Sequence, residues 1–83
     1  MPDEIVKRKL IALASRIKGR DISLAESSAI AINFSLKAPR TPGDLEAVLA
    51  ESLYETNASV HIKLAAHDDS DRLIREIVTA LGK

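Results

Sequence analysis

Five residues in the last third of the chain are of types that bind divalent metal ions. They are His61, His67, Asp68, Asp69 and Asp71. Imidazole and carboxylate groups are ordinary zinc ligands. However, His61 and His67 lie six positions apart, and an extended strand between them separates them by roughly 20 Å. The acidic residues also suit the first turn of a helix, where the helix dipole is positive. We therefore predict neither a metal site nor a cofactor.

A second candidate site lies at residues 37–43, which read Lys-Ala-Pro-Arg-Thr-Pro-Gly. The free backbone N–H groups at a helix start can hold a phosphate or another anion. The residues of this weak anion-binding candidate are Lys37, Arg40, Thr41 and Gly43. The stretch lacks the glycine spacing of a phosphate-binding loop, and Asp44 would compete with an anion. Ordinary capping of a helix by Thr41 is the simpler interpretation.

Charge is distributed unevenly along the chain, although 12 basic and 12 acidic residues give a net charge of zero. Residues 1–20 hold six basic residues against two acidic ones, whereas residues 21–83 hold six basic and ten acidic residues. The six basic residues that we predict to form an interaction face on the first helix are Lys7, Arg8, Lys9, Arg16, Lys18 and Arg20. Such a face can dock on an acidic protein surface, contact nucleic-acid phosphates, or lie in water.

No arrangement of residues points to catalysis. The chain has no Cys, which excludes thiol nucleophiles, disulfide bonds and thiolate zinc sites. No nucleotide-binding motif occurs. The length of the chain predicts that residues 1–83 form one small domain, and a domain of this size can seldom enclose a substrate pocket. Phe34 and Tyr54 are the only aromatic residues, so no platform for stacking single-stranded nucleic acid is expected.

Targeting segments are not expected either. The best apolar run near the start, residues 10–14, has five residues. A secretory signal needs about 7–15 such residues, and a membrane span needs about 18. The default expectation is a cytoplasmic protein that does not contact a membrane.

Three segments have the apolar spacing of amphipathic helices. The first covers residues 2–18 and ends at Gly19, a natural C-terminal cap. The second begins with Thr41 as cap and Pro42 in the first position, runs to about residue 55, and ends near Asn57. The third follows the polar start at residues 67–71 and contains the apolar positions Leu73, Ile74, Ile77, Val78 and Leu81.

Two further segments alternate between apolar and polar residues, which is typical of half-buried strands. One covers residues 29–37, preceded by a short strand at Ile22 and Leu24 and a turn at residues 26–28. The other covers residues 59–66. The apolar positions of the two strands are Ile30, Ile32, Phe34, Leu36, Val60, Ile62 and Leu64. This interpretation predicts an α+β fold with a two- to three-stranded sheet and three helices.

The alternative is an all-α bundle in which residues 23–37 form a helix. Ser23 followed three positions later by Glu26 matches a capping box. Ala25, Ala29, Ile32 and Leu36 then supply a helical stripe.

The function that best fits these features is a small protein-interaction module, either a homodimer or a subunit of a larger assembly. A chain of 83 residues has a thin core, and a small sheet leaves edge strands that invite pairing. The alternative is a nucleic-acid-associated accessory protein that contacts phosphates through its basic first helix.

Overall fold

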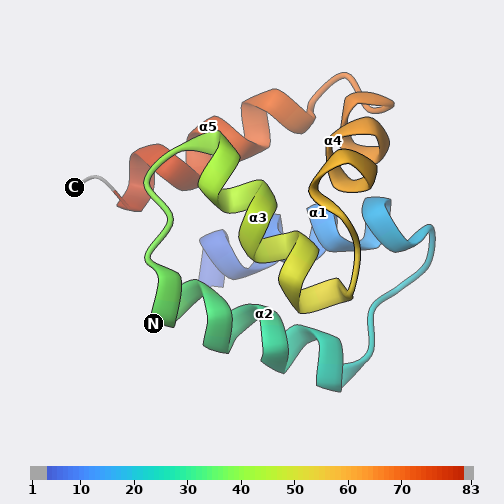
Figure 1. Cartoon of the computed structure of the whole chain (residues 1–83). Coiled ribbons are helices and arrows are strands. Elements are labelled where there is room, and N and C mark those ends of the chain that lie inside the picture. The colour runs from blue at the N-terminus through green and yellow to red at the C-terminus, as the bar shows by residue number, and fades with distance from the viewer. Residues whose placement is uncertain (1–3, 82–83) are drawn as a thin grey trace.

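The computed structural model describes residues 4–81, and this part of the chain contains five α-helices and no β-strand (Figure 1). The helices are α1 (Glu4–Lys18), α2 (Leu24–Lys37), α3 (Pro42–Leu53), α4 (Asn57–Ala65) and α5 (Ser70–Leu81). The predicted α+β fold with a small sheet is therefore wrong. The all-helical alternative describes the observed class.

Helix α2 replaces the predicted strand at residues 29–37 because its start is capped. The Ser23 side chain accepts a hydrogen bond from the Glu26 backbone N–H at 3.1 Å, and the Glu26 carboxylate accepts one from the Ser23 N–H at 2.8 Å. This reciprocal pair satisfies two backbone donors that a helix start leaves free. The expected short strand at Ile22 and Leu24 and the turn at residues 26–28 are wrong for the same reason, since α2 begins at Leu24.

The alternation in α2 has a helical explanation. Ile30 and Phe34 are four residues apart and both are buried, whereas Ile32 and Leu36 are also four apart and both are exposed. Each residue of an α-helix advances about 100° around the axis, so the two pairs lie on different sides. A helix with apolar residues on both its inner and its outer side thus imitates the period of a strand.

Helix α4 replaces the second predicted strand, at residues 59–66. Thr56 caps it by accepting a hydrogen bond from the Ser59 N–H at 3.0 Å. Val60 and Leu64 face the core, and Ile62 between them is 69% exposed. The predicted end of the preceding helix at Asn57 is wrong as well, since Tyr54 is the left-handed cap of α3, with φ 58°.

The three predicted helices are present. Gly19 has φ 71° and donates to the Ser15 carbonyl at 2.8 Å, as expected of the residue that ends α1. The predicted start of this helix at residue 2 lies outside the described residues. Thr41 caps α3 by accepting from the Asp44 N–H at 3.1 Å, with Pro42 in the first position.

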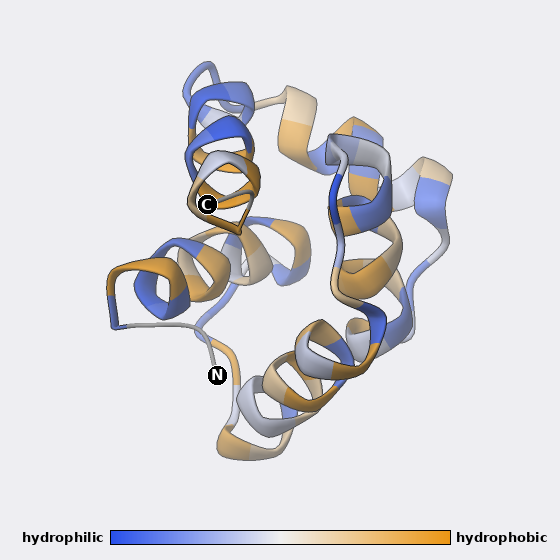
Figure 2. Ribbon diagram, turned by 90° about the vertical axis from the view of Figure 1, so that its left-hand side faces the viewer, coloured by the Kyte–Doolittle hydropathy of each residue, from blue (hydrophilic) through white to orange (hydrophobic). Residues whose placement is uncertain are grey.

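The core lies between α1 and the other helices, and α1 packs against all four of them. Figure 2 shows the helices hydrophobic on the sides that they turn towards one another. The buried apolar residues are Val6, Leu10, Leu13, Ala14, Ile17, Ile30, Phe34, Leu45, Val48, Leu49, Ala50, Leu53, Val60, Leu64, Ile74 and Ile77. Helix α2 lies at the margin of this arrangement, because it packs only against α3 and α1.

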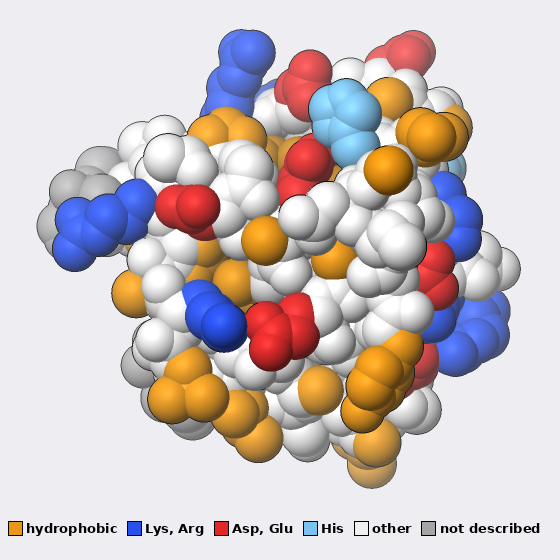
Figure 3. All heavy atoms as spheres, viewed as in Figure 1, with side chains coloured by type: hydrophobic (Ala, Val, Ile, Leu, Met, Phe, Trp, Pro, Cys, Tyr) orange, Lys and Arg blue, Asp and Glu red, His pale blue; other side chains and the backbone are white. Residues whose placement is uncertain are grey.

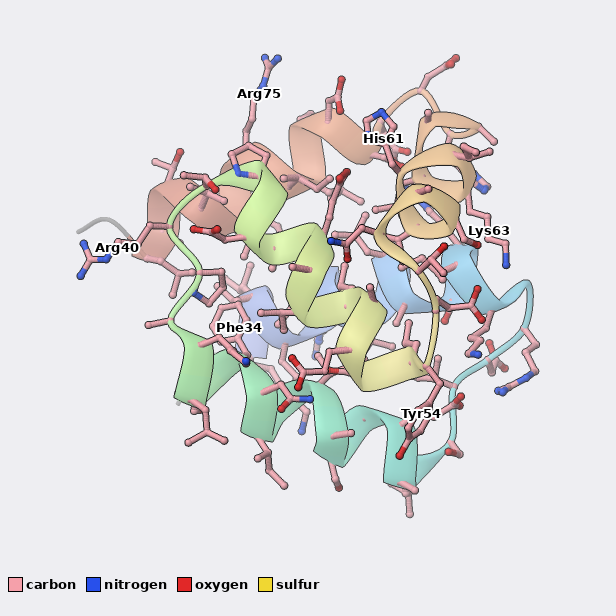
Figure 4. The ribbon with its side chains drawn as sticks, viewed as in Figure 1. Phe34, Arg40, Tyr54, His61, Lys63 and Arg75 are labelled. Atoms are coloured by element: carbon pink, nitrogen blue, oxygen red, sulfur yellow. The ribbon has the colours of Figure 1, made fainter. Side chains whose placement is uncertain are left out.

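A short polar network fixes the contact between α2 and α3. The buried Ser52 hydroxyl donates to the Val48 carbonyl at 2.7 Å and accepts from the Asn33 amide at 3.0 Å. Phe34 extends from α2 into the same contact (Figure 4). One side of α2 is therefore fully used by its neighbour, which leaves the opposite side to solvent.

Candidate interaction surface

Three of the six basic residues predicted to form an interaction face tie α1 to distant parts of the chain. Lys9 lies 3.6 Å from a Glu76 carboxylate oxygen, and Lys18 lies 3.0 Å from one of Glu55. The guanidinium of Arg16 lies 2.8 Å from Asp69 and also donates to the buried Ser70 hydroxyl at 3.1 Å. These side chains flank the buried stripe of α1 and act within the fold.

The other three basic residues make no ion pair with a distant part of the described chain. Arg20 forms a two-pronged pair with Glu26, with both N···O distances 2.9 Å, and Arg8 lies 3.7 Å from Glu4 of its own helix. Lys7 has no ion-pair partner among residues 4–81. The structure therefore does not bring the six cations together on one surface, and most of the uneven charge of the sequence is matched internally.

The strongest of these internal pairings surrounds Glu55. Its carboxylate accepts from Lys18 at 3.0 Å, from Lys63 at 3.1 Å and from the Ser59 hydroxyl at 3.1 Å. These hydrogen bonds, that from Lys18 first, lower the pKa of Glu55 from 4.5 to about 2. Glu55 thus remains charged in mildly acidic solution and joins α1, the α3–α4 turn and α4.

Two other carboxylates are stabilised in the charged form by arginine. The hydrogen bond from Arg20 is the main reason that the pKa of Glu26 falls to about 2, and the hydrogen bond from the Ser23 N–H adds to it. The hydrogen bond from Arg16 lowers the pKa of Asp69. Arg16 thus joins α1 to the turn before α5, and Arg20 joins the α1–α2 connection to the first turn of α2.

The anion-binding candidate lies at the start of α3, beside a groove of about 230 Å³ between α2 and α3. The groove is lined by Lys37, Asp44, Ala47, Val48 and Glu51. Lys37 lies 3.4 Å from Glu51. The Asp44 carboxylate accepts from the Arg40 N–H at 3.4 Å, while the Arg40 side chain points away from the helices (Figure 4). Carboxylates thus occupy the positions that an anion would need, and Thr41 and Gly43 serve the start of α3.

The metal-competent residues are dispersed. His61 on α4 faces Glu46 of α3, with its Nδ1 3.1 Å from a carboxylate oxygen, and Asp69 is engaged by Arg16. Within residues 4–81 no group of three or more His, Cys, Asp or Glu side chains is placed to hold a metal ion.

The surface that sequence reasoning missed is the outer side of α2. Its three large side chains are strongly exposed, Leu24 at 88%, Ile32 at 59% and Leu36 at 76%. Ala25, Ser28 and Ser35 lie among them and are exposed too. We call these six residues the outer face of α2. The signal was present in the sequence, because no charged residue occurs between Glu26 and Lys37.

The outer face differs from the exposed sides of the other helices. Charged residues stand on the exposed side of each of them, for example Arg8 on α1, Glu51 on α3, Lys63 on α4 and Arg75 on α5. Hydrophobic side chains gather along the lower edge of the molecule in Figure 3, where α2 lies in Figure 1. The outer face is therefore the best candidate for a surface that a partner covers.

Comparison with known proteins adds no relative. No protein-family model, no curated protein and no solved structure matches the chain. Among the described helices, none combines the length and the apolar character needed to cross a membrane.

Proposed function

We propose that this chain is a protein-interaction module whose contact surface is the outer face of α2. The observation that carries the proposal is the exposure of Leu24, Ile32 and Leu36 on one side of a helix without a charged residue on that side. Apolar side chains scattered singly over a surface are ordinary, but a contiguous apolar stripe is typical of an interaction site.

The energetics agree with this assignment. Burying a large apolar side chain contributes about 1.5–3 kcal/mol, and three such side chains lie on one side of α2, Ile32 and Leu36 one turn apart and Leu24 two turns before Ile32. The charges that would oppose burial are absent from this face, whereas Glu26 and Lys37 lie outside it and pair with Arg20 and Glu51. A protein partner can therefore cover the face without desolvating an ionised group.

The alternative of a nucleic-acid protein acting through α1 draws less support. Arg16 and Lys18, which would have to contact phosphates, already contact Asp69 and Glu55. Phosphate binding would require breaking these pairs, and the sequence pI near 6.7 provides no general attraction to a polyanion. The expected elution from heparin is below about 0.15 M salt.

The proposed function is tested by capture from a native lysate with three immobilised forms of the chain. These are the wild type, Ile32→Glu and Ile62→Glu. Ile62 is the matched control, since it is an isoleucine of similar exposure on α4, away from the outer face. We expect wild type and Ile62→Glu to capture the same protein, and Ile32→Glu to lose it. Equal capture by all three forms would reject the outer face as the contact surface.

A further inference from the structure

We infer that the partner of the outer face is a second copy of this chain, with the two α2 helices packed antiparallel across a two-fold axis. The inference rests on the proposed function and names the occupant of the same surface. In a two-fold dimer the same patch is used twice, so the patch must be complementary to itself. The outer face of α2 meets this condition in its shape and in its charge.

The shape argument comes from one ridge of the helix. Leu24, Ser28, Ile32 and Leu36 are spaced by four residues, and such rows form the ridges that pack into grooves at a crossing angle of about 50°. When two copies of this row run antiparallel, Leu24 meets Leu36 of the other copy and Ser28 meets Ile32. The small side chain of Ser28 on each copy thus faces the large side chain of Ile32 on the other copy, and the two-fold axis gives two such contacts.

The flanking residues allow close approach. Ala25 and Ser35 border the row and come opposite each other in the same alignment. Both are small, and so is Ser28 at the crossing point, which lets the two helix backbones approach to the shorter end of the usual range of about 8–10 Å. A parallel alignment would instead place Ile32 on Ile32 and Ser28 on Ser28, which leaves a clash and a void.

The charge argument favours a copy over an unlike partner with a charged surface. The outer face has no ionised group, and the net charge of the chain is zero, so two copies meet without repulsion. Four of the six basic residues of the first segment are already paired with acidic residues of the remaining chain, for example Lys9 with Glu76 and Arg16 with Asp69. The contact is therefore apolar, and its affinity should change little with salt.

The size of the face sets the expected affinity. Fourteen residues of α-helix are about 21 Å long, and one helix crossing covers less than the roughly 800 Å² per partner of a standard interface. We therefore expect a dissociation constant in the range of about 10–100 µM rather than a nanomolar dimer.

Sedimentation equilibrium of the full chain between about 2 and 500 µM tests the inference, in buffers of about 0.05 and 0.5 M salt. We expect a monomer–dimer equilibrium that is the same in both buffers. Ile32→Glu should weaken it at least tenfold, and Ile62→Glu should leave it within twofold. Circular dichroism checks that both variants remain helical, which their exposed positions favour.

A charge exchange tests the antiparallel register. Leu24→Glu and Leu36→Lys place charges at the ends of α2 that suit its dipole, so neither should unfold it. Each single variant should weaken the dimer at least tenfold. The double variant Leu24→Glu/Leu36→Lys should recover part of the loss, because the carboxylate introduced on one copy then meets the ammonium group introduced on the other. The double variant Leu24→Glu/Leu36→Glu should not recover, because two carboxylates then meet.

The outcomes separate the inference from the proposed function. A wild-type monomer at about 500 µM would overturn the dimer, and protein capture that still depended on Ile32 would then leave the outer face as the site of an unlike partner. A dimer that Ile32→Glu leaves intact would overturn the α2 dimer, and only equal capture by wild type and Ile32→Glu would overturn the proposed function as well. A dimer that both charge-exchange double variants weaken equally would overturn the antiparallel register.

Discussion

The two isoleucines of α2 that the strand interpretation placed on one face should differ sharply in their contribution to stability. Ile30 is 3% exposed and Ile32 is 59% exposed. Replacement by Ala removes three carbon groups in each case, each worth about 0.8 kcal/mol when buried. At Ile30 this gives about 2.4 kcal/mol, incomplete closure of the cavity adds about 1 kcal/mol, and the better helix propensity of Ala offsets about 0.4 kcal/mol, so the expected cost is about 3 kcal/mol.

At Ile32 the same arithmetic gives a much smaller effect. About two-fifths of the side chain is shielded, so the lost burial is about 1 kcal/mol. Ala is a better helix former than Ile by about 0.4 kcal/mol, which offsets part of this loss. The net cost should therefore be about 0.5 kcal/mol.

Urea unfolding followed by circular dichroism at 222 nm measures both variants, at about 2 µM protein so that self-association does not contribute. With a slope near 1–1.5 kcal/mol/M, Ile30→Ala should lower the midpoint by about 2 M and Ile32→Ala by less than about 0.5 M. Equal losses at both positions would refute the helical assignment of residues 24–37. A change in slope for either variant would show that the two midpoints are not comparable.

Three further predictions concern caps and ion pairs. Thr41→Ala should lower the free energy of unfolding in urea by about 1 kcal/mol, because the Thr41 hydroxyl caps the Asp44 N–H. An unchanged midpoint would show that this cap does not stabilise the fold. Ala38→Gly should raise the melting temperature by several degrees, since Ala38 has φ 44°, whereas Ala66→Gly at the right-handed cap of α4 should lower it. The folded-state pKa of Glu55 is lowered to about 2, so its contribution to stability is present above about pH 4.5 and is lost as the pH falls towards 2. The melting temperature of Glu55→Gln should therefore fall less than that of wild type over this range, while a part of the fall remains because the pKa of Glu26 is lowered too.

The helices that could be predicted have one apolar side and a visible cap. In α1 the buried residues Val6, Leu10, Leu13 and Ile17 follow steps of four, three and four, and Gly19 ends the pattern. The start of α3 could be predicted for a different reason. Thr41 is a preferred N-cap residue and Pro42 suits the first helical position, and neither preference depends on distant contacts. In both cases the local signal and the tertiary packing agree.

The two failures have a common physical cause. A helix is recognised by contrast between its sides, and α2 has little contrast because Ile32 and Leu36 remain apolar where solvent should favour charge. In α4, only Val60 and Leu64 are buried, and two residues four apart fit a strand as well as a helix. The capping residues Ser23 and Thr56 carried the correct information, but neither shows how far the helix that it starts will run.

The candidate site was hidden by the same ambiguity. The basic residues of α1 were conspicuous in the sequence, yet the acids that pair with them lie far along the chain, as Glu76 does from Lys9, and only the fold brings them together. Ile32 and Leu36 were assigned to the core of a sheet, so their exposure could not be anticipated.

The packing of α1 has a consequence for the chain while it is being synthesised. Helix α1 leaves the ribosome before α4 and α5, although both of these helices cover its apolar side. Asp69, the ion-pair partner of Arg16, is synthesised 53 residues after it. Helices α2 and α3 follow each other in the chain after a short connection, and they make their most extensive contact with each other. The α2–α3 pair can therefore form early, while the part of the α1 stripe that α4 and α5 cover stays exposed until these helices have been synthesised. A chain that ends before residue 70 lacks α5, so the apolar side chains of α1 that α5 covers in the complete fold are exposed to water.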